Sequence, residues 1–265
     1  MSGERGETPV ALKGIAGRML PLIDLTSLSG TETEADILRL ARAARTVLGP
    51  VAAVCLYPRW IGTARAALAN SGVRIATVTN FPAGGADIAA AVAETVAAVA
   101  AGADEVDVVF PYEAFLAGDG SIGIELVREC RLVCRPKVLL KVILETGRLA
   151  TPAAIRGAAD AAIEGGADFI KTSTGKLQPG ASLAAAEAML RAIAAARARR
   201  RWVGFKASGG IRTVSEAAPY LGLVDRILGE GAAMPANFRF GASALLDDIL
   251  LVLGAPVRDT SEDTY

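Results

Sequence analysis

The sequence contains no histidine. This absence excludes every catalytic triad and every metal site that depends on an imidazole. The remaining chemistry has to use Lys, Asp, Glu, Ser, Thr, Tyr or Cys side chains. Cysteine is scarce, and the three present suit a reducing cytoplasm. Cys130 and Cys134 lie four apart in a predicted helix and are expected in the core. Cys55 is also expected to be a small core residue, with a thiol lining the site as the alternative.

Net charge is also lacking, because 28 Lys and Arg residues balance 28 Asp and Glu residues. This balance gives no general electrostatic case for binding nucleic acid or a membrane surface. No apolar run reaches the roughly 20 residues that span a bilayer. The opening "MSGERGETPV" lacks the apolar stretch of a signal peptide. We therefore expect a cytoplasmic protein, and we interpret the basic run at 197–201 as a solvated helix end.

An alternation of short β-rich runs with Ala-rich segments fills most of the 265 residues, 52% of which are hydrophobic. That length and composition allow a sizeable core. The predicted strands are 21–26, 51–58, 74–82, 105–111, 137–146, 169–175, 202–210 and 225–229. The predicted helices between and after them are 33–46, 60–70, 86–101, 122–134, 152–165, 182–198, 213–221 and 243–252.

Eight strand–helix units in about 250 residues predict an α/β fold, the (β/α)8 TIM barrel. A doubly wound open sheet is the alternative, but it usually has fewer strands, and the first strand here lacks a Gly-rich turn. No linker rich in Pro, Gly or Ser divides the chain. We therefore predict one barrel domain over residues 1–253, with a short N-terminal helix near 9–18 and a flexible, polar tail over 254–265.

Two segments echo each other. "AGADEVDVV" (101–109) and "GGADFIKTS" (165–173) share Gly-Ala-Asp before an apolar run, and this alignment places Asp107 on Lys171. They belong to the fourth and sixth predicted strands. Because alternate barrel strands supply side chains to one interior layer, both residues should point inward at similar height. The echo predicts that a carboxylate and an amine share one pocket.

Two further lysines follow on neighbouring predicted strands, Lys206 in "GFKASGG" and Lys141 in "LLKVILETG". Burying such groups without partners costs several kcal/mol each. One interpretation is a satisfied salt-bridge network in which two lysines pair with Asp107 and Glu145. This structural role remains especially open for Lys141.

The functional interpretation explains the surplus lysine. An ammonium group cannot attack a carbonyl, so its pKa has to fall through desolvation or a neighbouring cation. Lys206 can be that cation for Lys171. A neutral Lys171 would then add to an aldehyde and form a Schiff base, which acts as an electron sink. Asp107, acting through water, is placed as the acid/base.

Phosphate binding is the second predicted feature. "STGK", "SGG" and "FGAS" follow the sixth, seventh and eighth strands, at the end of the barrel where such enzymes often bind phosphate. Gly209 and Gly210 allow close backbone approach, and Ser243 offers a hydroxyl beside the free amides of the following helix. The alternative is that these loops contain glycine only for their turns.

The segments "DLT", "AAVCLYPRW", "ATVTNFP", "GADEVDVVFPY", "LLKVILETG", "GADFIKTSTGK" and "GFKASGGIRT" resemble the signatures of deoxyribose-phosphate aldolases. The resemblance covers about residues 20–252 in the right order. It implies a class I aldolase that needs no metal or other cofactor. The implied reaction reversibly cleaves 2-deoxy-D-ribose 5-phosphate into D-glyceraldehyde 3-phosphate and acetaldehyde, in deoxyribose phosphate catabolism.

The resemblance also implies residue roles. Lys171 matches the Schiff-base lysine, Lys206 the second lysine, and Asp107 the acid/base. The substrate-binding residues expected with them are Asp24, Thr26, Lys141, Thr174 and Lys176. The expected phosphate-binding residues are Gly175, Gly209, Gly210, Gly241 and Ser243. "KASGG" has Ala-Ser where some relatives have Pro-Ala, and "FGASALL" has one serine where some have two.

The last residue, Tyr265, has two interpretations. It is either part of a frayed terminus or, as in the tyrosine-ended tails of some family members, a phenol that reaches the barrel mouth and moves a proton at the acetaldehyde methyl carbon. Two other functions stay open for the chain, another Schiff-base barrel such as a transaldolase and a non-catalytic sugar-phosphate-binding barrel. A homodimer is possible, although no interface signal is visible in the sequence.

Overall fold

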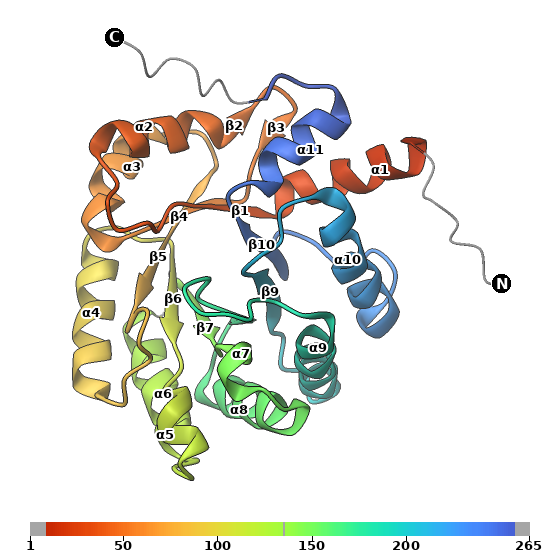
Figure 1. The fold of residues 1–265 in the computed structure, drawn as a ribbon. Helices are drawn as coiled ribbons and strands as arrows, with labels where there is room; N and C mark the ends of the chain where they lie inside the picture. Colours follow the sequence, from red (N-terminus) through yellow and green to blue (C-terminus); the bar gives the residue numbers. More distant parts are fainter. Residues whose placement is uncertain (1–8, 135, 258–265) are drawn as a thin grey trace, which may run out of the picture.

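Eight parallel strands close into a barrel in the computed structural model, which describes residues 9–134 and 136–257 (Figure 1). Each strand pairs with its neighbours in the order β1-β10-β9-β8-β7-β6-β5-β4, and β4 pairs with β1 to close the ring. The barrel strands are β1 (Ile23–Thr26), β4 (Ala53–Leu56), β5 (Arg74–Thr79), β6 (Glu105–Val109), β7 (Leu139–Ile143), β8 (Phe169–Lys171), β9 (Gly204–Ser208) and β10 (Phe238–Ala242).

Helices surround the strands on the outside of the barrel (Figure 1). They are α2 (Glu34–Ala43), α3 (Ile61–Ala67), α4 (Ile88–Ala100), α6 (Ile122–Cys134), α8 (Pro152–Gly165), α9 (Leu183–Ala198), α10 (Val214–Leu228) and α11 (Leu245–Leu253). Local chemistry fixes their ends. Thr33 and Asp36 form a capping box at the start of α2, and Pro152 occupies the first turn of α8. The predicted single-domain (β/α)8 barrel is confirmed.

The N-terminal helix α1 (Pro9–Met19) packs against α10 and α11 and leads through a 3₁₀ turn, Leu20–Leu22, into β1. Arg18 of α1 pairs with Asp225 of α10 at 3.0 Å. At the other end, α11 ends at Leu253. Part of the predicted tail lies outside the described residues, so the boundary at residue 253 stays a prediction. The remaining short elements are β2 (Arg45–Thr46), β3 (Gly49–Pro50), a 3₁₀ turn at Pro58–Trp60, α5 (Tyr112–Leu116) and α7 (Thr146–Leu149).

The predicted eighth strand at 225–229 is wrong. Those residues lie at and just after the end of α10, and the eighth strand is β10, at Phe238–Ala242. The helix passes through Gly222 because that position is exposed, while Ala217, Leu221 and Val224 keep a helical spacing of buried positions. The sequence prediction missed β10 because it assigned the last strand to the apolar run at 225–229, which continues α10.

The barrel interior has an apolar side and a charged side. Ala53 and Cys55 on β4 and Ala76 and Val78 on β5 form a small apolar cluster of their own. The other six barrel strands direct charged side chains inward, while their alternate residues join the large core beneath the helices. Cys55, Cys130 and Cys134 are all buried free thiols. Cys130 and Cys134 lie in the large core, as expected, whereas Cys55 belongs to the small apolar cluster inside the barrel.

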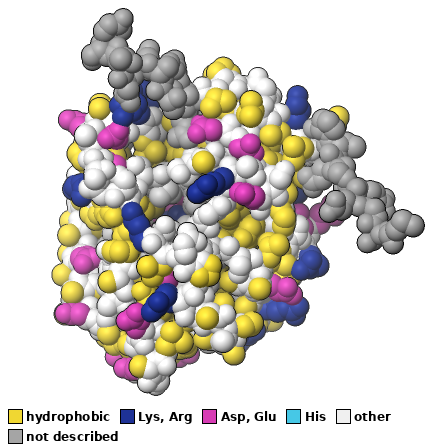
Figure 2. Space-filling model, in the orientation of Figure 1, with side chains coloured by type: hydrophobic (Ala, Val, Ile, Leu, Met, Phe, Trp, Pro, Cys, Tyr) yellow, Lys and Arg dark blue, Asp and Glu magenta, His cyan; other side chains and the backbone are white. Residues whose placement is uncertain are grey.

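The surface mixes charges of both signs. Figure 2 shows acidic and basic side chains interspersed among apolar ones on one face. Over residues 9–134 and 136–257, no helix is both long enough and apolar enough to cross a membrane.

Gly204, the first residue of β9, allows a test of packing inside the barrel. A Cβ added at Gly204 of β9 would meet ring carbons of the buried Phe169 at 2.5–2.6 Å. We therefore expect Gly204→Ala to lower the free energy of unfolding by about 1–3 kcal/mol through overpacking, measured by urea titration. Gly222→Ala is the control, because its Cβ meets nothing within 4 Å. That helical substitution should be stabilising by about 0.5–1 kcal/mol. Equal urea midpoints for the two variants would contradict this account of Gly204.

Candidate active site

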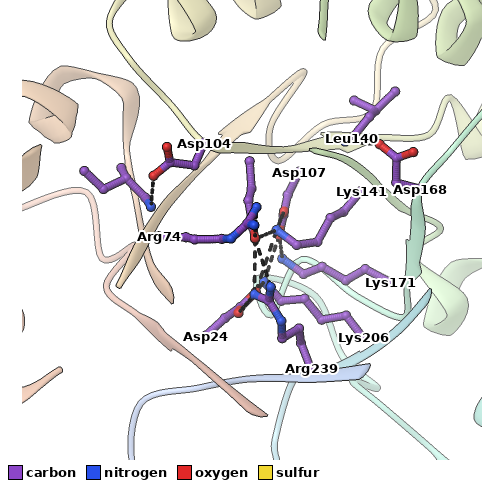
Figure 3. A network of polar contacts seen from close by, with 12 residues as sticks. Asp24, Arg74, Asp104, Asp107, Leu140, Lys141, Asp168, Lys171, Lys206 and Arg239 are labelled. Carbon is purple, nitrogen blue, oxygen red and sulfur yellow. Dashed lines mark hydrogen bonds and ion pairs between the residues drawn. The ribbon is translucent and has the colours of Figure 1, made fainter. Parts of the chain in front are cut away.

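Charged side chains from six strands converge at the centre of the barrel (Figure 3). Each is at most 2% exposed. Strand register brings them together, because Lys171 lies beside Lys206 on β9, and Lys141 lies beside Asp107 on β6. The cluster consists of Asp24 (β1), Glu105 and Asp107 (β6), Lys141 (β7), Lys171 (β8), Lys206 (β9) and Arg239 (β10). We call this set the interior cluster.

Asp107 lies at the middle of the interior cluster and contacts three ammonium groups. Its Oδ1 accepts from Lys141 Nζ at 2.7 Å, and its Oδ2 accepts from Lys171 Nζ at 3.0 Å and Lys206 Nζ at 2.9 Å. Burial alone would raise the pKa of Asp107, but the three lysines outweigh it and hold this pKa well below its usual range. Asp107 is therefore a carboxylate, and the predicted pocket shared by Asp107 and Lys171 is confirmed.

Lys206 is held as an ammonium ion by two carboxylates. Its Nζ lies 2.6 Å from Asp24 Oδ2, in addition to its contact with Asp107. Burial would lower its pKa, but the two carboxylates raise that pKa above its ordinary value. Lys206 is thus a permanent cation at neutral pH and is poorly suited to be a nucleophile.

Lys171 is the lysine with the weakest electrostatic support. Among the described residues, its Nζ forms an ion pair with Asp107 alone. Burial lowers the pKa of Lys171, and the neighbouring Lys206 cation lowers it further. Of the three buried lysines, Lys171 is therefore the one that most readily becomes a neutral amine.

The lower part of the interior cluster is a further set of ion pairs that sequence reasoning missed. Arg239 Nη1 lies 2.6 Å from Asp24 Oδ1, and Arg239 Nη2 lies 2.9 Å from Glu105 Oε1. Lys141 Nζ lies 2.6 Å from Glu105 Oε2. Glu105 precedes Asp107 by two positions on β6, so the period-2 rule for strands could have placed it inward. Arg239 was hidden by the misplaced eighth strand.

Over residues 9–134 and 136–257, Glu145 forms no ion pair with a lysine, which corrects the salt-bridge interpretation that paired it with one. Its Oε2 instead accepts from the backbone N–H of Thr174 at 3.2 Å and from the Thr174 hydroxyl at 2.5 Å. Glu145 is fully buried and adopts a left-handed backbone conformation, with φ of 56°. Its carboxylate fixes the loop that follows Lys171. The carboxylate that pairs with Lys141 is that of Glu105.

A groove of about 350 Å³ lies at the carboxyl ends of β1, β8, β9 and β10. It is positioned over the interior cluster, because Ser208 and Gly241 line it and lie two residues beyond Lys206 and Arg239. All five expected phosphate-binding residues line this groove, together with three expected substrate-binding residues. They are Gly175, Gly209, Gly210, Gly241, Ser243, Thr26, Thr174 and Lys176.

The other two expected substrate-binding residues, Asp24 and Lys141, are in the interior cluster and do not line the groove. Gly241 has a second role, because a Cβ there would meet Lys206 Cε at 2.8 Å. Lys176 donates from Nζ to the Leu28 carbonyl across the groove. Tyr265 lies outside the described residues, so its expected role stays a prediction.

Sequence reasoning missed part of the groove lining as well. Ser29, Gln178, Ser208 and Arg212 also line it. Arg212 stands in the same segment as Gly209 and Gly210, two residues after the pair, and its guanidinium adds a cation to the rim. Its position in the loop after β9 was a signal that could have been used.

The fold and the site define a (β/α)8 barrel with a buried amine–carboxylate cluster beneath a groove at the carboxyl ends of its strands, the face that carries the active site in barrel enzymes. The comparison with protein families is specific. Residues 18–248 match the DeoC/LacD family aldolase model, which covers most of the chain. The chain belongs to this aldolase family.

Solved structures of related proteins share the fold. A structure described as a candidate deoxyribose-phosphate aldolase from Toxoplasma gondii ME49 is 24% identical and has a TM-score of 0.86, covering 93% of this chain and 97% of its own. A second such candidate, from Coccidioides immitis, is 29% identical with a TM-score of 0.76, covering 88% of this chain and 86% of its own. The tetrameric deoxyribose phosphate aldolase from Aeropyrum pernix is 26% identical with a TM-score of 0.69, covering 92% of each chain.

The lowered pKa of Lys171 predicts a pH dependence of stability that needs no substrate. Between the lowered pKa of the folded state and the ordinary value near 10.4, the unfolded chain binds more protons than the folded one, so the free energy of unfolding rises with pH. Lys171→Met removes this contribution. We expect the stability of the parent relative to Lys171→Met to rise as the pH is raised through the lowered pKa toward the ordinary one, by about 1.4 kcal/mol per unit of pKa difference.

The measurement is urea unfolding at several pH values, with Lys13→Met as the matched control. Lys13 is exposed, so this variant and the parent should show parallel curves. Parallel curves for Lys171→Met and the parent would mean that Lys171 keeps its ordinary pKa.

Proposed function

We propose that this protein is a deoxyribose-phosphate aldolase that forms its Schiff base at Lys171. The observation that carries the proposal is the position of the Lys171 amine. It is buried, it lies 3.0 Å from the ionised Asp107 and beside the Lys206 cation, and it is beneath a groove with a Gly-rich rim. The family is one of aldolases, and the relative from Aeropyrum pernix carries this activity at 26% identity.

The first step is addition of the neutral Lys171 amine to the aldehyde carbon of open-chain 2-deoxyribose 5-phosphate. A proton taken up from solvent converts the hydroxyl of the resulting carbinolamine into water, and loss of that water gives an iminium ion with one positive charge. Asp107 is already against the nitrogen and stabilises this charge. Because the iminium withdraws electrons, the bond between the second and third sugar carbons can break heterolytically.

Cleavage requires a base for the hydroxyl on the third carbon. Asp107 takes this proton, through a water molecule, as the carbon–carbon bond electrons move into the enamine. Glyceraldehyde 3-phosphate leaves. Protonation of the enamine at its terminal carbon and hydrolysis of the resulting imine release acetaldehyde and restore Lys171. Lys206 stays charged throughout, which disfavours reprotonation of Lys171 before it attacks.

The groove is the proposed site of the phosphate and the sugar hydroxyls. Gly175, Gly209 and Gly210 all have positive φ values and line the groove with exposed backbone. Ser243 lies just before the first turn of α11, whose N-terminal amides favour an anion. Lys176 and Arg212 add positive charge to the rim.

The other proposed properties follow from this assignment. The substrates are small sugar phosphates and aldehydes, and the setting is deoxyribose phosphate breakdown in the cytoplasm. Tyr265 is proposed to assist proton transfer at the acetaldehyde methyl carbon. A transaldolase-type reaction and sugar-phosphate binding without catalysis are the alternatives, and the next experiment distinguishes all three.

Acetaldehyde should form the proposed Schiff base with Lys171. Borohydride should reduce this Schiff base to a stable ethyl adduct, which mass spectrometry of peptides would locate on Lys171. Lys171→Ala should lose both the adduct and the cleavage of deoxyribose 5-phosphate, because the Ala side chain offers no amine. A transaldolase would not use acetaldehyde as its donor, and a binding protein would form no adduct. Labelling at Lys206 in the Lys171→Ala variant would place the nucleophile elsewhere.

Ser243→Ala tests the phosphate site. We expect kcat/KM for deoxyribose 5-phosphate to fall about tenfold, on the scale of one lost hydrogen bond to a charged group, with little change for unphosphorylated deoxyribose. Ser29→Ala is a control on the same groove, in the loop after β1. Equal losses for the two sugars with Ser243→Ala would place Ser243 outside the phosphate site.

A further inference from the structure

The interior cluster contains unequal numbers of positive and negative groups. Its three carboxylates are Asp24, Glu105 and Asp107, and its four basic side chains are Lys141, Lys171, Lys206 and Arg239. If every group were ionised, one positive charge would be left over in a region with almost no solvent exposure. Uncompensated buried charge is strongly unfavourable, so the cluster favours the state in which one basic group is neutral.

The contacts decide which group loses the proton. Lys206 contacts Asp24 and Asp107, while Lys141 contacts Glu105 and Asp107. Arg239 contacts Asp24 and Glu105. Within the described part of the chain, Lys171 is the basic member of the cluster that pairs with a single carboxylate. Lys171 is therefore the group that loses its proton. Glu105 and Arg239 contribute to this charge balance through ion pairs with other members of the cluster.

We propose that Glu105 and Arg239 are positioning residues that set the protonation state of Lys171 from the opposite end of the interior cluster. Arg239 satisfies one oxygen of Asp24, which leaves the other oxygen for Lys206. Glu105 holds Lys141 against Oδ1 of Asp107, which leaves Oδ2 of Asp107 to accept from Lys171. The influence passes through these shared carboxylates and through the total charge. The inference deepens the proposed function and rests on it, because it concerns the amine that forms the Schiff base.

The groups around Lys171 are consistent with this role. The charged or titratable groups that face it from the other strands are Asp107, Lys206, Lys141, Asp24, Arg239 and Cys55. Burial raises the pKa of the Cys55 thiol, so it stays uncharged and does not alter the balance. Arg74 also reaches Glu105, at 3.7 Å, but its side chain is 49% exposed and its charge is screened by solvent.

Charge balance makes predictions of opposite sign for two residues in contact with each other. Arg239→Met removes the surplus positive charge, so Lys171 should keep its proton to higher pH. Glu105→Gln increases the surplus, so Lys171 should lose its proton at lower pH. The double variant Glu105→Gln/Arg239→Met restores the parental surplus, and Arg239→Lys retains it. A merely structural role would weaken activity in each variant without moving the titration in opposite directions.

The experiment measures the rate of Lys171 labelling by acetaldehyde and cyanoborohydride between about pH 5 and pH 9, with peptide mass spectrometry to confirm the site. We expect the rising limb to move up by about one pH unit or more in Arg239→Met and down by a similar amount in Glu105→Gln. It should return near the parental position in the double variant. Arg74→Met is the matched control, because it removes a screened cation from the same carboxylate and should shift the limb much less.

Two results separate this inference from the proposed function. If parental Lys171 is not labelled at all, the proposed function fails. If Lys171 is labelled but the two single variants leave the limb in place or move it in one direction, the inference is wrong. The same changes in the pKa of Lys171 can be measured without substrate. Lys171→Met is added to the parent and to each variant, and the resulting difference in free energy of unfolding is followed as a function of pH. If Arg239→Met does not fold, Glu105→Gln and the double variant still test the sign.

Discussion

The Asp107 carboxylate is the interaction on which the rest of the site depends. Three lysines share its two oxygens inside a barrel where solvent is almost absent. A carboxylate surrounded by three ammonium groups stays ionised. Lys171, which has fewer carboxylate partners than Lys141 or Lys206 within the described residues, becomes the weakest base of the three lysines. Repulsion from Lys206 adds to desolvation at Lys171, so one arrangement supplies both an activated amine and a base beside it. This pairing is what the proposed carbon–carbon cleavage needs.

Burying this much charge requires the surrounding strands to make room for it. The apolar side of the interior, formed by Ala53, Cys55, Ala76 and Val78, uses small side chains and leaves space for long ones from across the barrel. Gly241 serves the same purpose beside Lys206, since any Cβ there would collide with the lysine stem. The stability cost of the charges is offset by mutual ion pairing and by the large apolar core under the helices.

The groove depends on the strands as well as on its own loops. Glu145 follows β7 and binds the Thr174 hydroxyl and amide, so the loop after Lys171 is held from the adjacent strand. Gly209 and Gly210 adopt positive φ angles that favour glycine and give the rim its backbone surface. The amine and the groove are therefore fixed by neighbouring elements, which suits a reaction that needs a phosphate and an aldehyde held at a set separation.

The sequence by itself determined the barrel, seven of its eight strands and the residues that carry the proposed chemistry. Hydrophobic periodicity can be recognised from neighbouring residues alone. The similarity of segments 101–109 and 165–173 also indicates that Asp107 and Lys171 occupy equivalent inward positions on alternate strands. The strand at Phe238–Ala242 is missed because the sequence prediction assigns the eighth strand to the apolar run at 225–229, which belongs to the end of α10. Only the closed sheet shows that Arg239 lies inside. The pairing of Glu105 with Lys141 and Arg239, in place of the expected Glu145, was likewise decided by tertiary structure. Side-chain length and strand register decide which buried charges become partners. The linear sequence therefore shows neither the ion pairs nor the surplus of one positive charge, because both depend on which side chains meet inside the barrel.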